Sequence, residues 1–296
     1  MAVALVFPGQ GSQRPGMGAP WAGTAGWSLV ERAGQRLGRD LAGLLTEADA
    51  EQLRATREAQ LSTLLLSLLV LRALPAGLRV VAVAGHSLGE VTALCAAGVL
   101  DEDDAVQLVA ERGEAMRAAA DARPGAMAAV LGLDAQVVAQ VCAPLQDVWP
   151  ANDNAPRHVV VSGTPAGVET ARSALKAAGA RRVLPLPVGG AFHTPLMEPA
   201  RARLEAALAA VSYGEAQVPV LSNVTAQPHD GHVQRRLSEQ LTAPVRWRES
   251  LKQLPALGVD TVLELGAGGV LTGLTSRTLP DLRALSVATP EDLEKL

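Results

Sequence analysis

A serine between two glycines stands where a valine-rich segment meets an alanine-rich one, and this junction constrains the fold of the chain most strongly. Gly85, Ser87 and Gly89 follow residues 79–84 and precede residues 90–98. The first segment is typical of a fully buried parallel strand, and the second is typical of a helix. The turn between them must be tight, so glycines flank the serine to avoid clashes. Such a strand–turn–helix unit indicates an α/β fold.

Other segments extend this pattern to both ends of the chain. Residues 2–7 and 259–265 are short apolar runs that predict buried strands, and the leucines within residues 61–69 have helical spacing. We therefore expect an α/β-hydrolase-like large subdomain with a parallel sheet, formed by residues 1–125 and 189–296.

The middle of the chain predicts a different unit. Strands are expected over residues 126–131, 148–151, 158–162 and 182–187. Helices are expected from Asp134 to about Leu145 and from Thr164 to Ala178, where Gly179 ends the second. Residues 152–156 are expected to form a loop. The order β-α-β-β-α-β is that of a ferredoxin-like fold, so residues 126–188 are predicted to form an inserted ferredoxin-like small subdomain.

The composition excludes several classes of protein. The chain has 296 residues, a net charge of −4 and only seven aromatic residues, which argues against a nucleic-acid partner. Its longest apolar run, residues 61–71, is too short to span a membrane. Cys95 and Cys142 form no disulfide framework and have no metal-ligand spacing, so no metal is expected. The first residues do not resemble a signal peptide, which makes the cytoplasm the expected compartment.

Ser87 is the candidate nucleophile. At the end of a strand its hydroxyl would project from the sheet, and the N–H of Leu88, at the start of the helix, could donate to a developing oxyanion. The alternative is that Ser87 only caps the helix.

A serine nucleophile needs a base, and the chain has five histidines. His86 should point away from the neighbouring serine, His158 begins a strand, and His229 and His232 lie in a polar loop where we expect them to be solvated. His193 follows the inserted segment on a loop, from which it could reach a cleft between the subdomains. It is either the base or a capped surface histidine. No acid with the pattern of a third member follows it, but a main-chain carbonyl could orient the ring equally well.

Arg112 separates two kinds of chemistry. It lies 25 positions after Ser87 in a helical segment. A solvated helix arginine is the simpler interpretation. The alternative is a guanidinium that grips a substrate carboxylate through two hydrogen bonds. A plain esterase has no need of such a cation, whereas an enzyme for a dicarboxylic half-thioester does.

Five motifs together resemble one enzyme family, the malonyl-CoA:acyl-carrier-protein transacylases. They occur in the family's order over essentially the whole chain, and they are Phe7–Gln13, Gly85–Glu90, Glu111–Gly113, Gly190–His193 and Leu271–Leu274. Each motif alone is unspecific, but the combination is highly specific. The same catalytic fold occurs in acyltransferase domains of polyketide synthases.

The resemblance implies a role for each matching residue. Ser87 would be acylated by malonyl-CoA and then deacylated by the phosphopantetheine thiol of a holo acyl carrier protein. His193 would act first as base and then as acid. The N–H groups of Gln10 and Leu88 would form the oxyanion hole, and Arg112 would hold the malonyl carboxylate.

The resemblance also implies the surroundings of these residues. Gln60 would line the acyl pocket, Asn154 would lie near the site, and Phe192 would favour malonyl over methylmalonyl groups. A main-chain carbonyl near residues 243–246 would orient the histidine. The protein needs no cofactor of its own, because malonyl-CoA is a substrate and phosphopantetheine is carried by the partner.

The carrier is usually acidic, so a local basic patch must compensate for the negative charge of this chain. Lys176, Arg181 and Arg182 are the candidates, and a solvated helix end is the equal alternative. The sequence departs from the family pattern at residues 266–269, where Gly-Ala-Gly-Gly replaces Gly-Pro-Gly-Lys, and at His158, which replaces a glutamine. A monomer is the default expectation.

Two other functions compete with transfer. A serine hydrolase or thioesterase would use Ser87 and His193 with an acid partner and would not need Arg112. A non-enzymatic carrier-binding subunit would form no covalent adduct at Ser87. The choice between fatty-acid and polyketide synthesis stays open.

Overall fold

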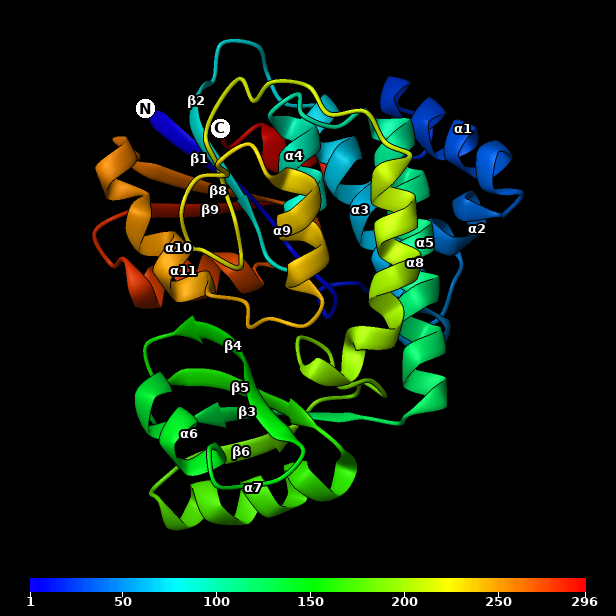
Figure 1. Cartoon of the computed structure of the whole chain (residues 1–296). Coiled ribbons are helices and arrows are strands. Elements are labelled where there is room, and N and C mark those ends of the chain that lie inside the picture. Colours follow the sequence, from blue (N-terminus) through cyan, green and yellow to red (C-terminus); the bar gives the residue numbers. More distant parts are fainter.

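The computed structural model describes all 296 residues and contains two separate sheets (Figure 1). The large sheet has five parallel strands in the order β7-β2-β1-β8-β9. Their bounds are β1 Ala2–Phe7, β2 Arg79–Gly85, β7 Val220–Leu221, β8 Thr261–Leu265 and β9 Arg283–Val287. The expected parallel sheet is therefore confirmed.

Helices cover both faces of this sheet because its central strands are apolar on both sides. Val3 and Leu5 of β1 belong to a core cluster of 47 residues, and Ala4 and Val6 belong to a separate cluster of 14 residues on the opposite face. The α-helices of the large part are α1 Ser28–Leu37, α2 Leu41–Thr46, α3 Thr56–Arg72, α4 Gly89–Ala96, α5 Glu102–Ala122, α8 Glu198–Ala209, α9 Val233–Gln240, α10 Trp247–Gln253, α11 Val270–Thr278 and α12 Pro290–Leu293. Short 3₁₀ turns lie at Ala19–Trp21, Ala25–Trp27, Gln52–Arg54, Pro195–Met197 and Pro255–Leu257.

The second sheet is antiparallel and lies below the first in Figure 1, in green. Its order is β4-β5-β3-β6, with β3 Ala126–Leu131, β4 Val148–Ala155, β5 His158–Gly163 and β6 Arg182–Pro185. The helices α6 Ala135–Cys142 and α7 Pro165–Ala177 share one core cluster with one face of the sheet. This is the strand order of a ferredoxin-like unit. The domain boundaries at residues 126 and 188 stay a prediction.

One expected loop is a strand in the structure. Residues 152–155 continue β4, with two irregularities in its register against β5. The reason is a contact distant in sequence: the N–H of Asp153 donates to the carbonyl of Val245 at 2.9 Å, and Asn152 forms a parallel bridge with the same residue. The polar composition of this segment predicted a loop because the sequence does not show this tertiary partner.

These elements place a cavity between the two sheets. The carboxyl ends of β1 and β2 meet there, with Phe7 opposite Gly85. Met127 and Val160 line the cavity from the small sheet, on the face that α6 and α7 leave uncovered, and α11 supplies Leu271 and Leu274. Ligands of open α/β sheets bind outside the carboxyl ends of the strands, so this is where a site is expected. None of the helices is both long and apolar enough to cross a membrane.

Candidate active site

The backbone around Ser87 forms a tight strand-to-helix turn that only glycines can flank. A Cβ at Gly85 would lie 1.8 Å from the carbonyl carbon of Gly89, and a Cβ at Gly89 would lie 2.0 Å from the carbonyl oxygen of Phe7. Ser87 itself has a φ of +53°, in the left-handed region that side chains rarely adopt. The turn aims the serine into the cavity, whose lining includes its side chain. The glycine spacing predicted this turn.

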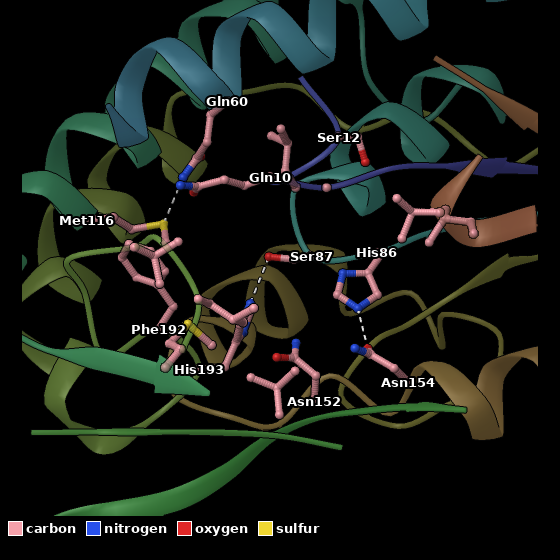
Figure 2. Close-up of a pocket in the computed structure, with 18 of the residues that line it drawn as sticks. Gln10, Ser12, Gln60, His86, Ser87, Met116, Asn152, Asn154, Phe192 and His193 are labelled. Carbon is pink, nitrogen blue, oxygen red and sulfur yellow. Dashed lines mark hydrogen bonds between the residues drawn. The ribbon is translucent and has the colours of Figure 1, made fainter. Parts of the chain in front are cut away.

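His193 faces this serine. Its Nε2 lies 2.8 Å from Ser87 Oγ, and the two side chains point toward one another in Figure 2. The histidine also has a positive φ, +61°, so both members of the pair are held in strained conformations. The structure thus brings together two residues that are 106 positions apart in the sequence.

The second ring nitrogen of His193 is held by a main-chain carbonyl rather than by an acid. Nδ1 lies 2.9 Å from the carbonyl oxygen of Gln240. The resemblance implied a carbonyl near residues 243–246, and Gln240 lies three residues before that segment. The carbonyl of Ala243 also acts on the ring, because it raises the pKa of His193 slightly. With Nδ1–H donating to a carbonyl, Nε2 is free to accept the serine proton.

The environment keeps His193 neutral. Burial, followed by the positive charge of Arg112, lowers its pKa to about 3, and the Gln240 carbonyl opposes this shift only in part. A neutral imidazole next to a serine hydroxyl can act as a general base at any pH near neutrality.

Arg112 is buried in the cavity, 3% exposed, rather than solvated on its helix. Its Nη1 donates to Oε1 of Gln60 at 2.7 Å, and its Nη2 donates to Oε1 of Gln240 at 3.0 Å and to Ser87 Oγ at 3.2 Å. These acceptors are neutral, so the guanidinium has no carboxylate to neutralise it. Burial lowers its pKa to about 10, which still leaves it cationic at neutral pH.

Two main-chain N–H groups near the nucleophile are available to an oxyanion. Gln10 and Leu88 both line the cavity, and the structure contains no protein acceptor for the N–H of either. The N–H of Ser87 is already used, because it donates to Oδ1 of Asn223 at 2.6 Å. The side chain of Asn223 also donates to the carbonyl of Gly85 at 2.6 Å and so braces the turn. Sequence reasoning missed this asparagine.

Three other candidate residues also line this cavity. The cavity has a volume of about 180 Å³, and its lining includes Gln60, Asn154 and Phe192. Nε2 of Gln60 contacts Sδ of Met116 at 3.1 Å (Figure 2). His86 turns away from the serine, and its Nε2 lies 2.8 Å from Oδ1 of Asn154.

Sequence reasoning missed Gln240, which contacts most of the site. Besides its bonds to His193 and Arg112, its Nε2 donates to the carbonyl of Ser87 at 3.0 Å and to the carboxylate of Glu90. The residue is 1% exposed although it is polar and ends a helix. The only available signal was its place three residues before the segment 243–246 that the resemblance singled out.

The basic candidates lie outside this cavity. Arg181 lines a different hollow of about 380 Å³ together with Arg157, His158 and Arg277. Lys176 and Arg182 are exposed and line neither hollow. The expectation that His229 is solvated is wrong: its side chain is 6% exposed and lies against Glu90. No cluster of three or more His, Cys, Asp or Glu side chains is placed to hold a metal ion.

Comparisons with known proteins find relatives along the whole length of the chain. The family model of the acyl transferase domain matches residues 4–290. The malonyl CoA-acyl carrier protein transacylase of Bacillus subtilis is 42% identical, over 99% of this chain and 95% of the relative. A solved malonyl-CoA:acyl carrier protein transacylase of Xanthomonas oryzae is 41% identical with a TM-score of 0.94, covering 100% of this chain and 98% of the other.

A further solved structure contains a holo acyl carrier protein of a type II polyketide synthase in complex with its malonyl transacylase. It has a TM-score of 0.96 and 38% identity, and it covers 100% of this chain and 98% of the other. Full-length identity at this level, with the motifs and their geometry in place, leaves one assignment: the chain belongs to the malonyl-CoA:acyl-carrier-protein transacylase family.

Proposed function

We propose that this protein transfers a malonyl group from malonyl-CoA to the thiol of an acyl carrier protein through a malonyl ester of Ser87. One observation carries the proposal: a buried guanidinium without a carboxylate partner lies 3.2 Å from the nucleophilic oxygen. An unpaired buried cation is costly unless the substrate supplies the anion. The cation of Arg112 therefore favours an acyl group that itself carries a carboxylate.

In the first half-reaction Ser87 Oγ attacks the thioester carbonyl while its proton moves to Nε2 of His193. The N–H groups of Gln10 and Leu88 donate to the oxyanion. When the intermediate collapses, the carbon–sulfur bond breaks and the coenzyme A sulfur takes the proton from His193. The malonyl ester of Ser87 remains, and the histidine is again neutral.

The second half-reaction reverses these roles with a different thiol. The phosphopantetheine thiol of the carrier gives its proton to His193 and attacks the ester carbonyl. The ester bond breaks, and Ser87 Oγ recovers the proton from the histidine. Ser87 and His193 thereby return to their starting protonation states. While His193 is protonated, the carbonyl of Gln240 can stabilise its imidazolium without itself gaining or losing a proton.

The residues around the acyl group set its identity in this proposal. Arg112 selects a carboxylate, and Gln60 and Gln240 each hold one of the two terminal nitrogens of its guanidinium. Phe192, 5% exposed and part of the cavity lining, restricts space beside the acyl chain, which favours malonyl over methylmalonyl. Asn154 holds His86 away from the nucleophile. The cytoplasmic location and the monomeric state stay predictions.

A direct test measures the arrival of the malonyl group on the carrier protein rather than the disappearance of malonyl-CoA. With malonyl-CoA and holo carrier protein, the carrier is expected to gain the mass of one malonyl group, and carrier without its phosphopantetheine arm is expected to stay unchanged. Free malonate formed at the rate of malonyl-CoA loss, without any gain of carrier mass, would favour the hydrolase instead.

We place the carrier contact at the mouth of the basic hollow. Arg181 directly precedes β6 of the small sheet and Arg277 belongs to α11, so an acidic helix could contact both subdomains at once. Lys176 and Arg182, both exposed, lie within five residues of Arg181 in the sequence and add to the positive charge of this segment. Complementary charge of this kind speeds encounter more than it adds affinity.

Charge reversal tests this contact. Arg181→Glu and Arg277→Glu are each expected to raise KM for the holo carrier about three- to tenfold at low salt, and less at high salt. KM for malonyl-CoA in acylation of the enzyme should change less. The matched control is Arg283→Glu, which starts β9 at the opposite end of the large sheet. Equal carrier KM values for all three variants and the wild type would rule out the contact.

A further inference from the structure

A second acid–base pair is buried directly behind the nucleophile. Nε2 of His229 lies 2.8 Å from Oε1 of Glu90, and the two side chains are 6% and 0% exposed. Glu90 stands in the first turn of α4, three residues after Ser87. His229 belongs to the loop between β7 and α9, and its own N–H donates to the carbonyl of Val220 at 2.9 Å. The transfer mechanism described above uses neither side chain.

Glu90 connects this pair to the active site. Its other oxygen, Oε2, accepts from Nε2 of Gln240 and from the N–H of Asn223 at 3.2 Å. Gln240 in turn orients His193 through its main-chain carbonyl and Arg112 through its side-chain oxygen. The carboxylate therefore fixes a residue that, like the nucleophile itself, contacts both the base and the guanidinium.

The hydrogen bond to His229 also limits whether Glu90 can form an ion pair with Arg112. The negative charge of Glu90 raises the pKa of Arg112 against the larger, opposing effect of burial. Yet Glu90 does not pair with the guanidinium, because one of its oxygens is occupied by His229 and the other by Gln240 and Asn223. A free guanidinium is what binding of a substrate carboxylate requires.

We infer that His229 is a positioning residue for the transfer reaction: its ring N–H anchors the Glu90 carboxylate, and through Gln240 it aligns His193 and keeps Arg112 free for substrate. The inference rests on the proposed function, because it is tested by the rates of malonyl and acetyl transfer. Without this donor, the buried carboxylate loses a partner and can turn toward the guanidinium. Both the rate and the preference for a carboxylated acyl group then fall.

His229 also lines a separate hollow of about 580 Å³, which shares no lining residue with the substrate cavity. Its Nδ1 is buried and has no protein partner. The other titratable or charged groups that line this hollow are Tyr213, Glu215, His232 and Arg235. The hollow gives replacements of His229 room to fit, and the exposed His232 offers a control in the same place.

The test compares two replacements of His229. His229→Gln keeps an N–H that can reach Glu90, and His229→Leu removes it. His229→Leu is expected to lower kcat/KM for malonyl-CoA about tenfold, the lower end of what the loss of a hydrogen bond to a charged group costs. It should lower kcat/KM for acetyl-CoA by less, so the malonyl-to-acetyl ratio falls. His229→Gln should keep the wild-type ratio, and His232→Leu should change neither rate.

A second measurement separates positioning from folding. In a Glu90→Gln background, His229→Leu is expected to have little further effect on the ratio, because the anchored charge is already gone. The inference would be overturned if the wild type and His229→Leu had equal malonyl-to-acetyl ratios. It would also be overturned if His229→Leu and His229→Gln lost equal amounts of kcat/KM in proportion to the fraction of unfolded protein. Absence of transfer by the wild type would instead overturn the proposed function.

Discussion

Arg112→Ala is expected to lower kcat/KM for malonyl-CoA by about 10²-fold or more, because a buried charge-assisted pair with the substrate carboxylate is lost. Acetyl-CoA has no carboxylate for the guanidinium to bind, so its rate should fall far less or rise. The malonyl-to-acetyl ratio should therefore drop at least about tenfold. Initial rates of enzyme acylation with both thioesters measure this ratio directly.

Two further variants make this test specific. Arg112→Lys keeps the charge but loses the planar fork, so its ratio should lie between those of the wild type and Arg112→Ala. Arg117→Ala removes an exposed arginine from the same helix, α5, and should behave like the wild type. Methylmalonyl-CoA separates charge from shape, since it keeps the carboxylate that Arg112 binds but adds bulk toward Phe192. Equal losses of malonyl and acetyl transfer in Arg112→Ala would contradict the assigned role.

His193→Ala is expected to slow acylation about 10³-fold, because the serine loses the base that lies 2.8 Å from its hydroxyl. Some rate should remain, since the oxyanion donors and Arg112 still bind the substrate. Single-turnover acylation by malonyl-CoA measures the step without the carrier. His232→Ala, at an exposed histidine, is the matched control. A His193→Ala enzyme with near-wild-type acylation would mean that another group takes the serine proton.

The pH dependence of kcat/KM for acylation tests whether His193 is buried and neutral in the working enzyme. A base must be neutral to act, and a pKa of about 3 keeps His193 neutral throughout the range in which an exposed histidine would titrate. Between pH 5.5 and 8, kcat/KM for acylation should therefore change by less than about twofold as far as this group determines it. Loss of half the rate near pH 6.5 would show that His193 is not buried in the working enzyme.

Local patterns were enough to predict the strand–turn–helix unit that carries Ser87. The glycines around Ser87 predicted its turn because a Cβ on either one would collide with neighbouring backbone. The strand order of the small sheet followed from the alternation of short strands and capped helices, such as the one that Thr164 begins by accepting from the N–H of Gly167.

Contacts between distant segments were beyond the reach of those patterns. Arg112 looked like a solvated helix residue, because the two glutamines that surround its guanidinium lie 52 and 128 positions away. His229 looked solvated for a similar reason, since its partner Glu90 lies 139 positions away in the sequence. The Asn-rich end of β4 was predicted as a loop because the sequence does not reveal its pairing with Val245. The family resemblance, rather than spacing, supplied the roles of Gln10, Gln60 and Phe192.

The covalent intermediate at Ser87 is the central claim, and the intact mass of the protein after incubation with malonyl-CoA alone tests it most directly. The wild type should gain the mass of one malonyl group, Ser87→Ala should gain none, and holo carrier protein should remove the adduct while gaining the same mass. An adduct that persists in Ser87→Ala, or turnover of malonyl-CoA by a wild type that never carries one, would contradict the account.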